Sequence, residues 1–206
     1  MLGDLFHMTK TWLHRFSRDE DAVVVVEAML VLPILLWAFG AGYVYFDAFR
    51  AKNLATKGNY AISDLLSRET NTVNANYVEG MGKVYQYLTR SNDKSWIRST
   101  VVVCTDKCDQ PDRELTVAWS YATKNHNILT DAAIAAQYDG AIPVMALGEV
   151  VIVMETHMQY VPALSEKITG LWAQDFYDIV MTRPRFVDNI PCDWQDTSYS
   201  SCKLTQ

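Results

Sequence analysis

The sequence predicts an α+β protein in which a long N-terminal transmembrane helix continues into a domain with a second helix and an antiparallel sheet. The first observation is an apolar run from Ala28 to Phe46 that contains no charged residue. The second is a helical spacing of apolar residues that continues past this run to about Arg68. The third is a set of β-branched and alternating segments beyond Ser95. A chain of 206 residues can hold one medium-sized domain and such an appendage.

The apolar run is long enough to cross a bilayer. At about 1.5 Å per residue it covers most of the roughly 30 Å hydrocarbon core. Trp37 lies in its second half, where an amphipathic ring suits the membrane interface. Pro33 removes a backbone donor, and we expect a kink there. The sequence therefore predicts a single-pass helix with an amphipathic extension over residues 22–68, after a cytoplasmic leader-like segment over residues 1–21.

A cleaved secretory signal peptide is the alternative interpretation of this run, with a small-residue site near Gly40. Its N-terminal region would be unusually long and would carry Asp19, Glu20 and Asp21 directly before the apolar part. Signal peptides have a short, positively charged region at that place. We therefore expect the helix to be retained.

Cysteine placement predicts the orientation, because the basic residues on the two sides of the span are equal in number. All four cysteines follow the span: Cys104, Cys108, Cys192 and Cys202. An even number in a domain outside the cytoplasm favours two disulfides, most simply Cys104 with Cys108 and Cys192 with Cys202. The other pairings, free thiols and a four-cysteine zinc site stay open, although C-x3-C fits zinc spacing poorly. We expect the N-terminus in the cytoplasm and residues 69–206 in the periplasm or outside the cell.

The predicted domain begins with a break at residues 70–72 and a helix with Val73, Tyr77, Met81, Val84, Tyr85 and Leu88 on one face. Strands are expected at Trp96–Cys104, Leu115–Tyr121, Gly148–Pro162 and Asp178–Val187, and a short helix at Asp131–Gln137. The tail from Asp188 to Gln206 has no regular pattern. Alternation predicts Glu155 and His157 as surface residues of a half-buried strand. We expect core positions for the larger aromatics Trp96, Trp119, Tyr121, Trp172 and Phe176.

Composition and motifs argue against several functions. The chain holds 18 basic and 24 acidic residues and no basic cluster, so nucleic acid is not expected as a partner. No catalytic motif of the metalloprotease or nucleophile-elbow type occurs, and C-x3-C is not the redox spacing C-x2-C. The sequence predicts no enzyme activity, no cofactor and no metal site.

The stretch from Arg15 to Leu36 reads RFSRDEDAVVVVEAMLVLPILL. It resembles the N-terminus of the TadE-like minor pseudopilins of Tad (tight adherence, type IVc) pili. Members of this family have a basic stretch with Phe, acidic residues, a small residue, a Glu at the fifth following position and an apolar helix with an early Pro. Here these features are Ala22, Glu27 and Pro33, with Ala22 in place of the usual Gly. The segment Arg183–Phe186 also resembles the family.

The resemblance implies a pilin-like subunit that supports assembly of a pilus and adhesion to surfaces. A prepilin peptidase would cut between Ala22 and Val23, and Glu27 would neutralise the new amine of a neighbouring subunit in the membrane. The implied partners are the plasma-membrane bilayer, the prepilin peptidase, other pilin-like subunits and the pilus assembly platform. The alternative is a single-pass, membrane-anchored periplasmic binding or sensor module that does not polymerise.

Overall fold

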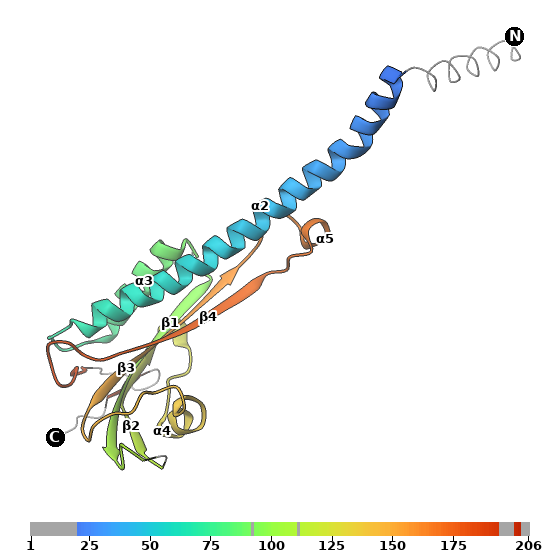
Figure 1. The fold of residues 1–206 in the computed structure, drawn as a ribbon. Coiled ribbons are helices and arrows are strands. Elements are labelled where there is room, and N and C mark those ends of the chain that lie inside the picture. Colours follow the sequence, from blue (N-terminus) through green and yellow to red (C-terminus); the bar gives the residue numbers. More distant parts are fainter. Residues whose placement is uncertain (1–19, 92, 111, 194–199, 203–206) are drawn as a thin grey trace, which may run out of the picture. The chain divides into compact units, whose positions relative to one another are not determined.

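The computed structural model describes residues 20–91, 93–110, 112–193 and 200–202. The helical elements are α2 (Glu20–Ser67), α3 (Ala75–Thr89), the turn η1 (Thr123–Asn125), α4 (Asp131–Ala133), the π-helical turn η2 (Ile134–Tyr138) and α5 (Glu166–Thr169). The strands are β1 (Ser95–Asp106), β2 (Glu114–Ala122), β3 (Val150–Tyr160), β4 (Gln174–Thr182) and β5 (Ser200–Cys202). These elements confirm the predicted α+β class (Figure 1).

The chain forms two compact units. One contains the chain up to Asp47 together with Pro162–Trp172, and the other contains Ala48–Val161 and the chain from Ala173 onward. The helix α2 therefore contributes its first part to one unit and its last part to the other. Its end at Ser67 lies within one residue of the predicted end at Arg68.

The second unit is built on an antiparallel sheet with the strand order β4-β3-β1-β2-β5. The strand β3 lies between β1 and β4, and its register places Glu155 opposite Arg98 on β1 and opposite Ile179 on β4. The strand β5, in the tail for which no regular pattern was expected, adds to the edge at β2. A bridge between Val73 and Cys192 holds another part of the tail.

Both faces of the sheet are covered (Figure 1). Residues 48–67 of α2 and the helix α3 lie on one face, where Gly82 of α3 faces Ile97 of β1. The segment with α4 and η2 covers part of the other face, and its buried Ile134 and Tyr138 belong to one apolar cluster with Val102 of β1 and with β3. The central strands therefore have a core on each side.

The last part of α2 packs on the domain through small and polar residues. Ala55, Asn59, Ile62 and Ser63 are fully buried, and the Asn59 amide donates a 3.0 Å hydrogen bond to the carbonyl of Asp178 on β4. The Ser63 hydroxyl lies 3.3 Å from the hydroxyl of Thr182 on the same strand. These bonds help to explain why polar residues occupy the buried face of the helix, because they satisfy the Asn59 N–H and the Ser63 hydroxyl, which would otherwise be costly to bury.

Several details of the sequence-based prediction were wrong. The helix α3 begins after the N-cap Asn74, and its buried residues are Val78, Met81, Gly82, Tyr85 and Thr89, so its buried face differs from the predicted one. The strand β4 begins four residues before the expected Asp178 and ends at Thr182. The aromatic Trp172, expected in the core, is 65 % exposed, because it belongs to the connection between β3 and β4.

Candidate functional site

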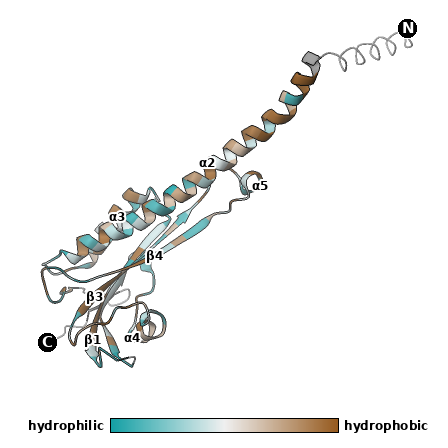
Figure 2. Cartoon of the chain, in the orientation of Figure 1, coloured by the Kyte–Doolittle hydropathy of each residue, from teal (hydrophilic) through white to brown (hydrophobic). Residues whose placement is uncertain are grey.

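The first candidate site is the apolar start of α2. Every residue from Val23 to Phe39 is exposed, and the helix over Val23–Ser67 contains a window that is apolar enough to cross a membrane and 0 % buried. Figure 2 shows that most residues in this part of α2 are hydrophobic. A soluble domain rarely exposes so large an apolar surface, and such surfaces mark contacts with lipid or with other proteins. Within the part of the chain that the structure describes, one helix is thus suited to a membrane anchor.

The residues predicted for processing and assembly lie on this exposed segment. The bond between Ala22 and Val23 falls in the first turns of α2, which begins at Glu20. Val23 and Glu27 are four residues apart on one helix, so their side chains share a face at about 5–6 Å between Cβ atoms. Glu27 is exposed, and α2 continues without interruption through Pro33. The four-residue spacing on one helix therefore places the Glu27 side chain near the backbone of Val23.

The second candidate feature is the disulfide between Cys104 and Cys108, which confirms this part of the predicted pairing. Their Cα atoms are 5.9 Å apart, and both residues are buried in the cluster that joins β1 to η2. Bonded sulfurs cannot serve as thiolate ligands, so the alternative of a four-cysteine zinc site is wrong. Cys192 is also disulfide-bonded. The side chain of Cys202 lies outside the described residues, and its bond with Cys192 stays a prediction.

Non-reducing peptide mapping of protein taken directly from cells should recover two linked peptides. One should join Cys104 with Cys108 and the other Cys192 with Cys202, because oxidising compartments preserve such bonds. Opening the short Cys104 loop by a double substitution to serine should cost on the order of 2–3 kcal/mol of stability. Recovery of four thiols that alkylate without reduction would contradict both the pairing and the expected location of the domain.

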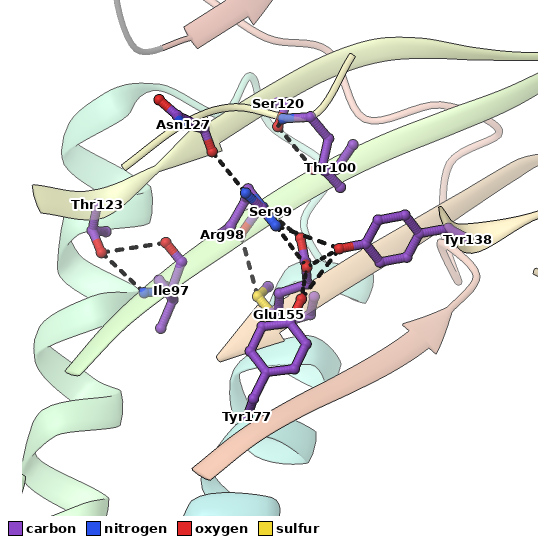
Figure 3. Close-up of polar contacts among 12 residues, drawn as sticks. Ile97, Arg98, Ser99, Thr100, Ser120, Thr123, Asn127, Tyr138, Glu155 and Tyr177 are labelled. Atoms are coloured by element: carbon purple, nitrogen blue, oxygen red, sulfur yellow. Dashed lines mark hydrogen bonds and ion pairs between the residues drawn. The ribbon is translucent and has the colours of Figure 1, made fainter. Parts of the chain in front are cut away.

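A third feature, which sequence reasoning missed, is a buried ion pair on the sheet. Glu155 of β3 is 0 % exposed, and its carboxylate accepts hydrogen bonds from Arg98 Nε at 2.5 Å and Nη2 at 2.8 Å. The hydroxyl of Tyr138 on η2 donates to the same carboxylate at 2.5 Å, and the hydroxyl of Tyr177 on β4 donates to it as well. Figure 3 shows Glu155 at the centre of these donors.

The environment shifts the pKa values of Arg98, Tyr138 and Tyr177. Burial alone would lower the pKa of Arg98, but the hydrogen bond and the charge of Glu155 outweigh burial and raise it. Burial and the hydrogen bond to Glu155 both raise the pKa values of Tyr138 and Tyr177. The guanidinium therefore stays charged and both hydroxyls stay protonated donors. Groups of the protein itself occupy the lone pairs of the Glu155 carboxylate, so we assign this residue a structural role.

The prediction that Glu155 is a surface residue was wrong, and its partners explain why. Arg98 and Tyr177 come from the two strands next to β3, and Tyr138 comes from the turn that covers this face. A usable signal was present in the sequence: opposite charges occur within two otherwise apolar strands, as Arg98 in the β1 region and Glu155 in the β3 region. Charges within such strands are rarely buried without a partner.

An aromatic cluster lies beside the ion pair. The Trp96 ring stacks on His126, with ring centroids 4.5 Å apart, and on His157, with centroids 5.6 Å apart. Arg98 lies over the same indole ring at 5.6 Å. Burial lowers the pKa of His126, and the nearby His157, Arg98 and Lys124 lower it further. His157 is half-buried, which agrees with the surface position predicted for it.

The residues predicted for processing and assembly and the residues predicted for disulfides thus lie in different parts of the chain's structure. Val23, Glu27 and Pro33 share the exposed part of α2, whereas Cys104 and Cys108 lie in the core of the second unit. The buried Arg98–Glu155 ion pair adjoins the apolar cluster that contains Cys104 and Cys108, because Tyr138 belongs to that cluster and donates to Glu155. Comparison of the chain with protein-family models, with curated proteins and with solved structures finds no match.

Proposed function

We propose that the chain is a minor pilin-like subunit that supports assembly of a Tad-type pilus and adhesion to surfaces. In this proposal α2 crosses the plasma membrane, the N-terminus faces the cytoplasm, and the disulfide-bearing domain lies on the opposite side. The subunit acts through contacts of its helix with other subunits and with the assembly platform. It performs no chemistry in this role.

The observation that carries the proposal is the difference in burial between the two parts of α2. One uninterrupted helix has an apolar, fully exposed first part and a last part whose Ala55, Asn59 and Ile62 are buried in the domain. A simple anchor needs a span and a linker. A helix that is both the span and a core element of the domain instead connects the domain, without a separate linker, to whatever the exposed part contacts. Subunits that assemble through their helices require such a connection.

Exposed aromatics on α2 support the same role. Phe46 is 79 % exposed, Phe49 66 % and Tyr60 61 %, and all three follow the uncharged run or lie at its end. These side chains extend the apolar surface of α2 beyond the proposed span. Helices of neighbouring subunits could bury them, which at about 25 cal/mol per Å² would contribute substantially to association.

Glu27 supplies the specific contact in the proposal. Its carboxylate is exposed, and among the described residues no ion pair engages it. A carboxylate within an apolar helix costs about 2.5–3.5 kcal/mol near the bilayer centre and less toward an edge. A positively charged amine on a neighbouring subunit would offset this cost, since paired charges are tolerated in apolar surroundings far better than single ones.

Processing of the N-terminus tests this proposal. Intact mass and N-terminal sequencing of protein from native membranes should show a chain that begins at Val23, because Ala22 is small and Glu27 holds the fifth position after it. Deletion of the prepilin peptidase should restore the longer chain. A simple anchor would not be cut at its cytoplasmic edge, so an intact N-terminus in cells with active peptidase would contradict processing. Cleavage near Ala41 would instead support the signal peptide.

A further inference from the structure

The connection between β3 and β4 forms one unit with the apolar part of α2. This connection, Pro162–Trp172, contains the short helix α5. The indole Nε1 of Trp37 donates a 2.7 Å hydrogen bond to the carbonyl of Ile168. A Cβ atom at Gly40 would lie 3.4 Å from Leu164, in van der Waals contact, so the two segments are close at this position. The connection therefore lies beside α2 at Trp37–Gly40, within the run that has no charges.

This placement limits the depth at which the helix can sit. The connection has charged, exposed side chains, Glu166 and Lys167, and an irregular backbone on either side of α5. Neither exposed charges nor irregular backbone is tolerated within the hydrocarbon core. The hydrocarbon on the domain side must therefore end near Trp37. From Val23 to Trp37 the helix covers about 21 Å, and local thinning of the bilayer would supply the rest.

The connection nevertheless also exposes apolar side chains. Leu164, Ile168 and Trp172 are 37 %, 55 % and 65 % exposed, and they recur at intervals of four residues. Within α5 the backbone is satisfied locally, since Gly170 N–H donates to the carbonyl of Glu166 at 2.7 Å and Ser165 caps the helix. Exposed apolar side chains next to charged ones, on a backbone with its own hydrogen bonds, are typical of segments that lie in the interface plane of a membrane. Tryptophan in particular is enriched at that level.

We propose that Pro162–Trp172 docks on the lipid headgroup region at the domain side of the membrane. Leu164, Ile168 and Trp172 insert toward the acyl boundary, while Glu166 and Lys167 stay among the headgroups. The hydrogen bond from Trp37 fixes the connection to the helix, so the docked segment sets the depth of α2 in the bilayer. This proposal rests on the membrane span proposed above. It places the end of the span near Trp37, whereas composition alone extends it to Phe46.

Depth measurement by spin labelling tests the docking. The full chain is placed in vesicles of phosphatidylethanolamine and phosphatidylglycerol with a nitroxide at Ile168→Cys. Two reference variants are Leu32→Cys in the proposed span and Tyr87→Cys on α3, where Tyr87 is 84 % exposed. The wild type, whose described cysteines are all disulfide-bonded, controls for background labelling. Collision rates with oxygen and with a water-soluble nickel complex then give the depth of each label.

We expect the label at residue 32 to favour oxygen most strongly, the label at 87 to favour nickel, and the label at 168 to lie between them. Its depth should be within about 5–10 Å of the headgroup boundary. A label at 168 that behaves like the label at 87, or like the label at 32, would overturn the docking. Shielding at 168 that develops only when the protein-to-lipid ratio rises would overturn it in favour of a second copy. A water-exposed label at 32 would overturn the span as well, which separates the two failures.

Discussion

Replacing Glu27 with glutamine should abolish or strongly reduce pilus formation and surface adhesion while leaving the rest of the protein intact. The change removes the negative charge and keeps nearly the same shape. The neighbouring amine would then have no counter-charge in an apolar environment, where an unpaired charge is very costly. Membrane insertion should be unchanged or improved, since a neutral residue inserts more cheaply.

The test is complementation of a deletion strain, scored for pili, adhesion and the amount of protein in the membrane. Glu27→Asp, which keeps the charge, is the matched control and should retain part of the activity. The thermal stability of the disulfide-bearing domain should be the same in all variants, because Glu27 and that domain belong to different units. Normal piliation with glutamine would make Glu27 incidental, and loss of the protein would make it a folding residue.

A substitution of Glu155 by glutamine should strongly destabilise the domain. The Arg98 side chain is only 13 % exposed, so loss of its partner leaves a charge that water solvates poorly. Removing one member of a buried pair costs about 3–5 kcal/mol. For a chain of this size that corresponds to a fall in Tm on the order of 10 °C.

The matched control is Asp112→Asn, which breaks an exposed pair of 2.7 Å with Lys107. Their side chains are 63 % and 46 % exposed, and a pair of this kind contributes about 0–1 kcal/mol. Thermal unfolding of the full chain in detergent, followed by near-ultraviolet circular dichroism, compares the two variants. An equal, small fall in Tm for both would contradict the role assigned to Glu155. A double variant with Arg98→Met should lose less than the sum of the single changes.

The features predicted correctly from sequence are those that local patterns determine. The end of α2 near Arg68 follows from a helical spacing that continues past the uncharged run. The strand β1 follows from its β-branched residues. The bond between Cys104 and Cys108 was predicted as the simplest pairing, because these two cysteines are only four residues apart. Each of these depends on residues that are close together in the chain.

The missed features depend on what covers a surface after folding. Alternation along β3 places Glu155 and His157 on the same face of the strand. It does not show that η2 covers Glu155 and leaves His157 half-exposed. On α2 the apolar side chains of Phe49 and Leu65 are exposed, whereas the polar Asn59 is buried. Asn59 is buried because β4 offers it a carbonyl, and no pattern within α2 contains that information.

The same reasoning applies to the connection between β3 and β4. Its Trp172 was expected in the core because large aromatics usually are buried. The hydrogen bond between Trp37 and Ile168 instead associates this segment with the apolar part of α2, more than a hundred residues earlier in the chain. A pairing over this distance in sequence is a tertiary contact, which composition and periodicity do not report.

The most direct test of the central claim is to count surface pili on cells that lack this chain. We expect the deletion to remove pili and surface adhesion, and the full chain supplied in trans to restore both. Electron microscopy of intact cells and recovery of sheared filaments measure the two states. Normal numbers of pili on the deletion strain, with the other pilus components present at their usual levels, would contradict the assembly role and favour a membrane-anchored binding or sensor module.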